Sequence, residues 1–368
     1  DHVGAGAIWR GGTVDDFAVM NLADLDRYDY SLPPELIRKM PLEPRDSARL
    51  FIYDTATDTV RFDAFAHLAD YLPPASLVVL NNTRVHPARL WLQKPTGGKI
   101  EVFVLVNEWD GQGLIPAFVD RKLSIGDRLV FPNGDGFVVE RQDEQRFFFR
   151  LESAQPLFEL LNTFGLTPVP HYLESDSAPD EAMLRKRYQT VFAAAGQSVA
   201  APTASLHFTD RVFEALEERG IETERITLDV GPGTFAPLTE RNFETGRLHT
   251  ERVTVTAAAA QRLNVAKETN HPVVAVGTTV ARTLETVRQQ GSVQAHTGLI
   301  DTFIYPPYRF TAVDILLTNF HLPKTSLMLL VDAFLQDKGA KQSVTDLYAI
   351  AIQERFAFYS FGDSLLIR

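Results

Sequence analysis

The chain has 368 residues and contains no cysteine. Disulfides, a thiolate nucleophile and cysteine-bound zinc or iron–sulfur centres are therefore excluded. No apolar run approaches the roughly 18 residues of a membrane span, so we expect no contact with a membrane. The opening residues, beginning Asp1 and His2, lack the basic start and apolar stretch of a secretory signal. These absences favour a cytoplasmic enzyme.

Positive charge is scarce as well. The sequence has 36 Lys and Arg against 47 Asp and Glu, a formal net charge of −11. Loose, general binding to nucleic acid needs a basic surface and is disfavoured, although a local basic groove is compatible with this balance. A G-x-G-x-x-G-like loop after an early strand is also missing, which disfavours an ordinary methyltransferase.

The length predicts two domains. Residues 1–20 are glycine-rich and weakly patterned, and we interpret them as a poorly ordered extension. Between 88 and 151, short strands separated by Gly, Asp and Asn follow one another without helical periodicity, which predicts a small inserted β-barrel. Helices and strands alternate on both sides of it, so we expect an α/β domain over 21–87 and 152–368.

Several local patterns predict single elements. Ser31, followed by two prolines, is typical of a helix start. Residues 50–65 show two alternating runs around a Thr/Asp turn and predict a hairpin, while 77–82 predict a buried strand. Gly220 is expected to end the helix of RVFEALEERG, and a further helix is expected to begin near Pro323.

The most informative stretch is SVAAPTASLHFT, residues 198–209, at a predicted passage from strand to helix. Its small residues allow a ligand to approach the backbone closely, and Thr203 and His207 can then hydrogen-bond it. A purely structural loop would more often use Gly, Asn or Asp. The alternative for His207 is a buried histidine bonded to a backbone carbonyl, and we favour the functional role.

A second candidate junction is VVAVGTTVARTLE, which is typical of a strand, a turn and a helix. Gly277 eases the turn, and Thr278 and Thr279 open the helix, whose first N–H groups can hold a polar ligand. Arg282, one turn later, can bind a carboxylate or phosphate. An ion pair with Glu285, three residues on, is equally easy.

Three further loops carry polar candidates. In DVGPGTFAPL the glycines permit close backbone approach, although packing alone can require them. In TNFHLPK, His321 and Lys324 precede the predicted helix, where lysine and helix-start N–H groups can bind an anion; a capped helix with a surface lysine fits equally well. In FYSFGDS the aromatic side chains can stack on a base, or can simply form core.

Arg84 and Arg89 lie five residues apart around Pro87, so both can reach one anion. Contact with tRNA or a domain-linking ion pair is compatible with this spacing. For Arg89 we favour the ion pair.

Taken in order, these segments resemble the S-adenosylmethionine:tRNA ribosyltransferase-isomerase family of queuosine biosynthesis. Motifs such as YDYSLPPELI, LVVLNNTRVHPARL, SVAAPTASLHFT and LLTNFHLPKTSLMLLVDAF run in the family's order from Asp29 to Ile367. The resemblance implies transfer of the ribosyl part of S-adenosylmethionine to 7-aminomethyl-7-deazaguanine at the tRNA wobble position. The sugar is isomerised, so that epoxyqueuosine forms and adenine and methionine leave.

The partners that the resemblance implies are S-adenosylmethionine as co-substrate and a tRNA with a modified wobble guanine, with no metal. The fold class implied is α/β, a barrel-like α/β main domain with a small inserted antiparallel β-barrel domain, in a monomer or weak oligomer. The sulfonium acidifies the adjacent ribose methylene, so a positioned base can remove a proton there. Adenine leaves more easily when a ring nitrogen is protonated or hydrogen-bonded.

Four residues are our candidates for catalysis: Thr203, His207, Asp229 and His321. The remaining candidates for substrate binding lie in the matching motifs, and they are Arg84, Arg89, Pro202, Ala204, Phe208, Gly231, Gly233, Thr234, His249, Gly277, Thr278, Thr279, Arg282, Tyr305, Asn319, Lys324, Ser360, Gly362 and Asp363.

Two positions depart from the family's pattern. Asp229 stands where the family usually has His, which replaces a titratable donor by an acceptor that is normally ionised. Ser205 stands where Gly is usual. Two alternatives follow: a divergent relative using S-adenosylmethionine on another nucleoside, or a non-catalytic tRNA- or nucleotide-binding protein on the same scaffold. Retention of the PTA-His, GTT-Arg and TNFHLPK segments favours catalysis.

Overall fold

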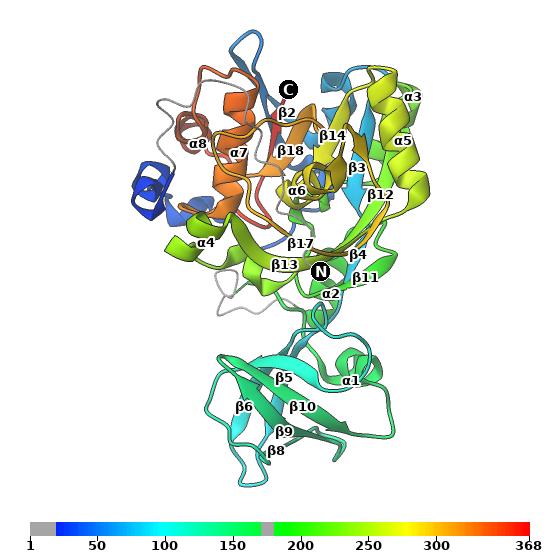
Figure 1. The fold of residues 1–368 in the computed structure, drawn as a ribbon, viewed down its shortest axis with the longest axis vertical. Coiled ribbons are helices and arrows are strands. Elements are labelled where there is room, and N and C mark those ends of the chain that lie inside the picture. Colours follow the sequence, from blue (N-terminus) through cyan, green and yellow to red (C-terminus); the bar gives the residue numbers. More distant parts are fainter. Residues whose placement is uncertain (1–19, 171–179) are drawn as a thin grey trace.

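The computed structural model describes residues 20–170 and 180–368, so all but the last residue of the expected N-terminal extension lies outside the described part. A large mixed sheet with helices occupies the upper part of Figure 1, and a small barrel lies below it. The α/β class predicted from the sequence is confirmed.

Nine strands form the large sheet, in the order β17-β13-β12-β3-β14-β18-β19-β1-β2. Their bounds are β1 Arg49–Asp54, β2 Thr59–Ala64, β3 Leu77–Asn81, β12 Glu222–Asp229, β13 Arg247–Val255, β14 Val273–Val276, β17 His296–Thr302, β18 Ile315–Asn319 and β19 Ser364–Ile367. The central pairs from β12 to β18 are parallel, and so is the pair of β19 with β1. The remaining neighbours pair antiparallel, including β13 with β17 and β1 with β2 at the two outer ends. The sheet has two edges, which corrects the expected barrel-like main domain, because antiparallel strands end the parallel winding on each side.

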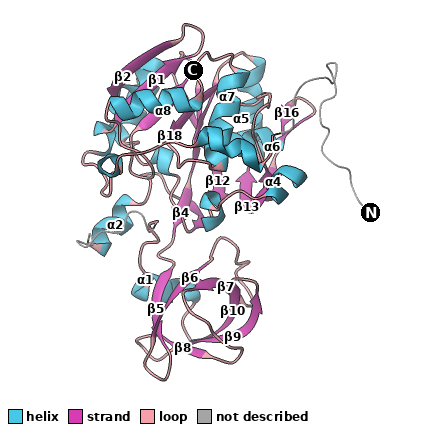
Figure 2. Ribbon diagram, turned by 90° about the vertical axis from the view of Figure 1, so that its left-hand side faces the viewer, coloured by secondary structure: helices cyan, strands magenta, loops and turns pink. Residues whose placement is uncertain are grey.

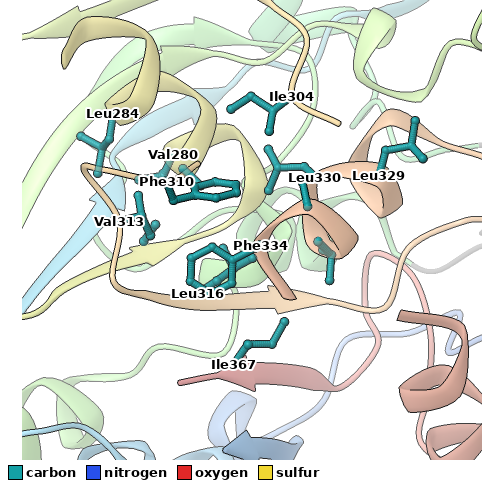
Figure 3. Packing of buried hydrophobic residues seen from close by; sticks show 14 of the residues in the cluster. Val280, Leu284, Ile304, Phe310, Val313, Leu316, Leu329, Leu330, Phe334 and Ile367 are labelled. Atoms are coloured by element: carbon teal, nitrogen blue, oxygen red, sulfur yellow. The ribbon is translucent and has the colours of Figure 1, made fainter. Parts of the chain in front are cut away.

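Both faces of this sheet are buried. Along β3, Leu77 and Val79 face one core while Val78 and Leu80 face the other, as the period of two in a strand requires. Figure 3 shows part of the first core, where Phe310, Phe334 and Ile367 pack around the sheet. Each such side chain contributes roughly 1.5–3 kcal/mol when fully buried.

The helices of the upper part divide between the two cores. Helices α5 (Ala257–Glu268), α6 (Thr278–Val287), α7 (Ser326–Asp337) and α8 (Val344–Gln353) contribute to the first core. Helix α3 (Asp210–Glu218) and a 3₁₀ helix at Phe65–Tyr71 contribute to the second. Shorter elements complete this part of the chain: β4 Thr83–Val85, β11 Ala195–Ser198, β15 Arg288–Gln289, β16 Ser292–Val293, α2 Glu181–Arg187 and α4 Glu240–Thr245.

Six antiparallel strands close into a barrel in the order β10-β7-β6-β5-β8-β9 (Figure 2). They are β5 Arg89–Gln93, β6 Lys99–Val104, β7 Ile115–Val119, β8 Arg128–Val130, β9 Gly136–Asp143 and β10 Arg146–Glu152. Alternate residues such as Val102 and Val104 fill its interior, to which helix α1 (Leu157–Phe164) adds Leu160 and Leu161. These strands occupy the stretch where the sequence predicts an inserted barrel.

Local expectations had mixed outcomes. The hairpin at 50–65 and the C-terminal glycine at Gly220, with φ of +68°, are confirmed. The helix expected after Ser31 is only a 3₁₀ turn at Pro34–Leu36, because Pro34 holds the residue before it in an extended conformation. Helix α7 begins at Ser326 rather than near Pro323, because Lys324 adopts a left-handed φ of +58° and Thr325 caps the helix.

Candidate active site

A cavity opens at the carboxyl ends of β14 and β18, two parallel neighbours in the sheet. Ligands of open α/β sheets bind at this edge. Its empty volume is about 680 Å³. The residues that line this strand-end cavity are Ala201, Pro202, Thr203, Ala204, Val230, Val276, Gly277, Thr278, Thr279, Thr318, Asn319, Phe320, His321, Leu322, Thr325, Leu327, Tyr359 and Ser360.

The polar lining is neutral and rich in hydroxyl groups. It consists of five threonines, a serine, a tyrosine, one amide and one imidazole, and no Asp, Glu, Lys or Arg occurs among the described residues of the lining. Apolar side chains such as Val276 and Leu327 complete the wall. Such a cavity suits a ligand with several hydrogen-bonding groups, which the hydroxyl, amide and backbone N–H groups can meet.

Thr203 and Asn319 meet inside the strand-end cavity. Thr203 Oγ1 donates a hydrogen bond to Asn319 Oδ1 at 2.9 Å. Asn319 is 3% exposed, and its Nδ2 has no hydrogen-bond partner among the described residues. A buried donor without a partner is costly, so this amide is suited to a bound ligand.

The start of α6 also reaches this cavity. Gly277 has a φ of +96°, which favours glycine, and it precedes the first helical residue, Thr278. No side chain of the described residues caps this helix. Its first N–H groups are therefore suited to an acceptor such as a carboxylate.

His321 carries the imidazole of the strand-end cavity. Its Nε2 lies 2.9 Å from Thr318 Oγ1, and its backbone N–H donates to the Tyr348 hydroxyl at 2.9 Å. Burial lowers the pKa of His321 to about 3, so the ring is neutral at neutral pH. The Tyr30 hydroxyl donates a hydrogen bond to the backbone carbonyl oxygen of His321 and so holds the same turn.

His207, our other histidine candidate for catalysis, does not line this cavity. Its Nε2 lies 2.7 Å from the Gly362 carbonyl oxygen and its Nδ1 3.1 Å from that of Arg45. Burial lowers the pKa of His207, which favours the neutral ring. The geometry matches the structural alternative, because the polar edges of the ring face backbone oxygens. Ser205 is fully buried nearby.

Asp229 also lies outside the cavity lining, although Val230 belongs to it. Asp229 Oδ1 accepts the backbone N–H of Gln197 at 2.7 Å, which ties β12 to the end of β11. Burial raises the pKa of this carboxyl group.

The loop after β12 packs tightly against its neighbours. A Cβ atom at Gly231 would lie 2.5 Å from Asn107 Nδ2, and one at Gly233 would lie 2.5 Å from the His249 ring. The glycines therefore serve close packing, and neither lines the cavity. The side chain of Thr234 lies outside the described part of the structure.

Arg282 is buried and pairs with Glu251 of β13 rather than with a ligand. Burial lowers its pKa to about 10. The expected alternative partner, Glu285, instead accepts backbone N–H groups of Thr311, Ala312 and Val313. Both expectations for Arg282 are corrected, because the chain brings β13 against α6 and turns Glu285 toward another loop.

The other cationic candidates are also dispersed. Lys324 binds the carboxylates of Asp26 and Asp29, with Nζ to oxygen distances of 2.9 and 3.0 Å. Arg89 pairs with Glu101 inside the barrel at 3.3 Å, while Arg84 is exposed on β4. This ion pair of Arg89 joins two neighbouring strands of the barrel, β5 and β6.

The remaining candidates have structural surroundings. Asp363 is buried and accepts from the Arg38 guanidinium and two backbone N–H groups. A Cβ at Gly362 would lie 2.5 Å from the Phe358 backbone. Phe208 is fully buried against Phe65, and Tyr305 packs on Phe303.

Nine of the candidates named from the sequence line one cavity, and several of their neighbours in it were not named. Those that lie together in the cavity are Pro202, Thr203, Ala204, Gly277, Thr278, Thr279, Asn319 and Ser360, in addition to His321. Thr318 and Thr325, which flank His321 in sequence, were not named. For Tyr359, one of the FYSFGDS aromatics, base stacking and core packing were both left open; its φ is +69° and it lines the cavity.

Two searches gave negative results for the part of the chain that the structure describes. Within residues 20–170 and 180–368, no cluster of three or more His, Asp or Glu side chains could hold a metal ion. Within the same residues, no helix is long and apolar enough to cross a membrane.

An open α/β sheet with a polar cavity at the ends of its parallel strands defines the class of α/β enzymes. Residues 25–367 match the family model described as "Queuosine biosynthesis protein". The chain belongs to this family.

Individual relatives agree with this assignment. The S-adenosylmethionine:tRNA ribosyltransferase-isomerase of Moorella thermoacetica is 40% identical over 351 residues, which cover 93% of this chain and 99% of that protein. The relative of the same name in Aquifex aeolicus is 39% identical over 351 residues, with the same coverage. The crystal structure of S-adenosylmethionine tRNA ribosyltransferase from Thermotoga maritima matches with a TM-score of 0.52 at 30% identity, covering 93% of this chain and 99% of that one.

Proposed function

We propose that this chain transfers the ribosyl part of S-adenosylmethionine to 7-aminomethyl-7-deazaguanine at the tRNA wobble position and isomerises it, forming epoxyqueuosine. Adenine and methionine are the products released. The observation that carries the proposal is the neutral, hydroxyl-rich cavity at the ends of β14 and β18, in a chain that belongs to the queuosine biosynthesis family.

The strand-end cavity is the proposed site of S-adenosylmethionine. Asn319 Nδ2, the buried donor without a partner, would bind an acceptor of the adenosyl group. The uncapped start of α6 at Gly277 and Thr278 would accept the methionine carboxylate. Both features offer hydrogen-bonding groups to a ligand in the same cavity, and S-adenosylmethionine has polar groups at separate points that could use them.

His321 is the proposed proton acceptor. The chemistry requires removal of a proton from the methylene beside the sulfonium, and a neutral imidazole can accept it. Thr318 holds the ring through Nε2. The apolar wall, including Val230, Val276 and Leu327, would limit access of water to reactive intermediates.

His207 and Asp363 are assigned here as positioning residues. His207 contacts the Gly362 carbonyl oxygen, and Asp363 belongs to the same turn, which Arg38 holds through Phe361 and Asp363. This turn follows Ser360 of the cavity lining. Asp229 is assigned in the same way, because it holds the strand that leads into the loop of Thr203. The exchange of the family's usual His for Asp229 thus falls outside the cavity lining, and this supports retained activity over a non-catalytic scaffold.

We further propose the domain organisation suggested by the sequence, an α/β domain over 21–87 and 152–368 with a barrel domain over 88–151 inserted. The protein would act in the cytoplasm as a monomer or weak oligomer, without a metal, and with a tRNA partner. The barrel strands share a core that is separate from the two cores of the large sheet, which supports a separately packed insert; α1, outside the proposed bounds of the insert, also packs on this core.

The test is an adenine-release assay with S-adenosylmethionine and a tRNA that bears the aminomethyl-deazaguanine base. We expect adenine release only in the presence of this tRNA, and epoxyqueuosine in the digested tRNA by mass spectrometry. Absence of adenine release, in parallel with an active relative as positive control, would refute the proposed function.

A further inference from the structure

A second and larger opening lies between the barrel and the large sheet, with an empty volume of about 1340 Å³. We call it the barrel cleft. The barrel contributes Glu101, Phe103, Phe118 and Asp120 to its lining, and the α/β part contributes Ala200 and Leu322.

The barrel side of this cleft is an ordered aromatic and acidic surface. Phe103 on β6 and Phe118 on β7 are directly opposite in the antiparallel pair. Glu101 lies two residues before Phe103 and therefore on the same face, whereas Val102 points into the barrel core. Opposite aromatic residues on one face form a platform wide enough for a planar ring.

The charge of the barrel side is acidic. Arg89 compensates Glu101, with 3.3 Å between Nε and Oε1. Asp120 Oδ1 accepts the backbone N–H of Glu101 at 3.0 Å, and its ion-pair contact is to Arg121, 3.8 Å away on an exposed side chain. The lining thus holds two carboxylates and one guanidinium, a surplus of one negative charge. The Arg146 guanidinium, outside the lining, lies 5.7 Å from the centre of the Phe118 ring and pairs with Glu108.

The barrel cleft and the strand-end cavity are adjacent and share part of their lining. Leu322 lines both, and Ala200 of the cleft is followed in sequence by Ala201 of the cavity. A ligand in the cleft and a ligand in the cavity would be neighbours across this wall.

From this juxtaposition we propose that the barrel cleft binds the wobble base of the RNA substrate, extruded from its stack, with its ring on Phe103 and Phe118 and its ammonium group at Asp120. This inference rests on the proposed function. Enzymes that modify a base must bring it out of the stack, and aromatic side chains then hold it. A base with a cationic aminomethyl arm matches a platform that combines two rings with surplus negative charge.

The experiment compares two anticodon stem-loops, one with 7-aminomethyl-7-deazaguanine and one with 7-methyl-7-deazaguanine, which lacks the amine. Their dissociation constants are measured by fluorescence anisotropy for Phe118→Ala and Asp120→Asn. The matched controls are Phe148→Ala on β10 and Asp143→Asn at the end of β9, which do not line the cleft. S-adenosylmethionine affinity is measured by calorimetry for each variant.

Loss of a stacking ring is expected to weaken both stem-loops about 10- to 100-fold, because base stacking contributes about 1–3 kcal/mol. Asp120→Asn is expected to weaken the aminomethyl stem-loop about 10-fold and to leave the methyl stem-loop unchanged, since only the former is cationic. S-adenosylmethionine affinity should stay at the wild-type value in both variants. If Phe118→Ala lowers the melting temperature, Phe118→Leu keeps the apolar volume and removes only the ring.

The outcomes separate the two proposals. If the cleft variants and their controls bind the stem-loops with equal dissociation constants while the wild type turns over normally, the proposed binding of the base in the barrel cleft is wrong. The proposed function would then remain intact. Wild type without product would refute the proposed function, and the comparison of the two stem-loops would still decide whether the cleft recognises the amine. An equal loss for both stem-loops with Asp120→Asn would overturn the role of its charge.

Discussion

The hydroxyl of Thr203 donates to the side-chain oxygen of Asn319 over 2.9 Å, and this contact joins the loop after β11 to the end of β18. Because the oxygen of the amide is occupied, its nitrogen is left as the donor for a ligand. Two residues 116 positions apart in sequence thus set the orientation of one hydrogen-bonding group.

Asn319→Ala removes that donor. We expect the dissociation constant for S-adenosylmethionine to rise about 10-fold, since a hydrogen bond to a buried group contributes about 1–1.5 kcal/mol. Isothermal titration calorimetry measures the change. Asn133→Ala, in an exposed barrel turn, serves as control. Unchanged affinity in Asn319→Ala would remove this amide from the ligand site.

His321→Gln replaces the imidazole by a group that cannot take up a proton. We expect turnover to fall about 10²- to 10⁴-fold, the usual contribution of general base catalysis, while S-adenosylmethionine binding changes little. Single-turnover adenine release measures the effect, with the exposed His67→Gln as control.

The pH profile adds a second criterion for His321. Its pKa is lowered to about 3, so protonation of this ring should not reduce the wild-type rate between pH 8 and about 5. A loss of rate with an apparent pKa near 6.5 that His321→Gln removes would contradict the neutral state described here.

His207→Ala tests the structural placement of that ring. The neutral ring donates to one of the two carbonyl oxygens that it faces, those of Arg45 and Gly362, and its removal leaves that oxygen without its buried donor, so we expect the free energy of unfolding to fall by about 1–3 kcal/mol. Urea denaturation followed by circular dichroism measures this loss. A variant with full stability and no turnover would instead support the catalytic role that the sequence favoured.

His249 should make the stability of the fold depend on pH. Burial, with Arg282 nearby, lowers its pKa from 6.5 to about 4. Between these values the unfolded chain binds a proton that the folded chain does not, so stability falls as the pH drops from about 6.5 to 4. The contribution amounts to up to about 3 kcal/mol.

The comparison with His249→Gln isolates this contribution. The variant should lose less stability than the wild type over that range, and the exposed His271→Gln should behave like the wild type. Parallel pH profiles for the wild type and His249→Gln would contradict the lowered pKa.

The sequence could locate strand ends but not long-range partners. Gly277 and Thr278 were predicted at a strand-to-helix junction because glycine and the change of periodicity mark it locally, and they line the cavity. Arg282 of helix α6, by contrast, pairs with Glu251 of strand β13, which lies 31 residues earlier in the sequence. No local pattern contains that information, because the sheet order decides which charges meet.

The same limit explains His207 and Lys324. A histidine in a loop of small residues is compatible with ligand binding or with burial. In the structure His207 is buried, and its ring nitrogens face the backbone carbonyl oxygens of Arg45 and Gly362, which are distant in sequence. Lys324 was interpreted with the following helix, whereas Asp26 and Asp29, nearly 300 residues earlier, bind it. Local patterns predicted the series of short strands in the barrel, but they could not predict the order in which these strands pair.

One feature of the large sheet bears on how the chain is made. β19 is inserted between β18 and β1, so the β1–β2 hairpin reaches the remaining strands only through residues 364–367. During synthesis on the ribosome the β1–β2 hairpin emerges long before residues 364–367 and must wait for them before it gains its place. Until then Phe51 and Ile52 lack their neighbour Leu365 and Leu366, and a chain interrupted before this segment would expose them to chaperones and proteases.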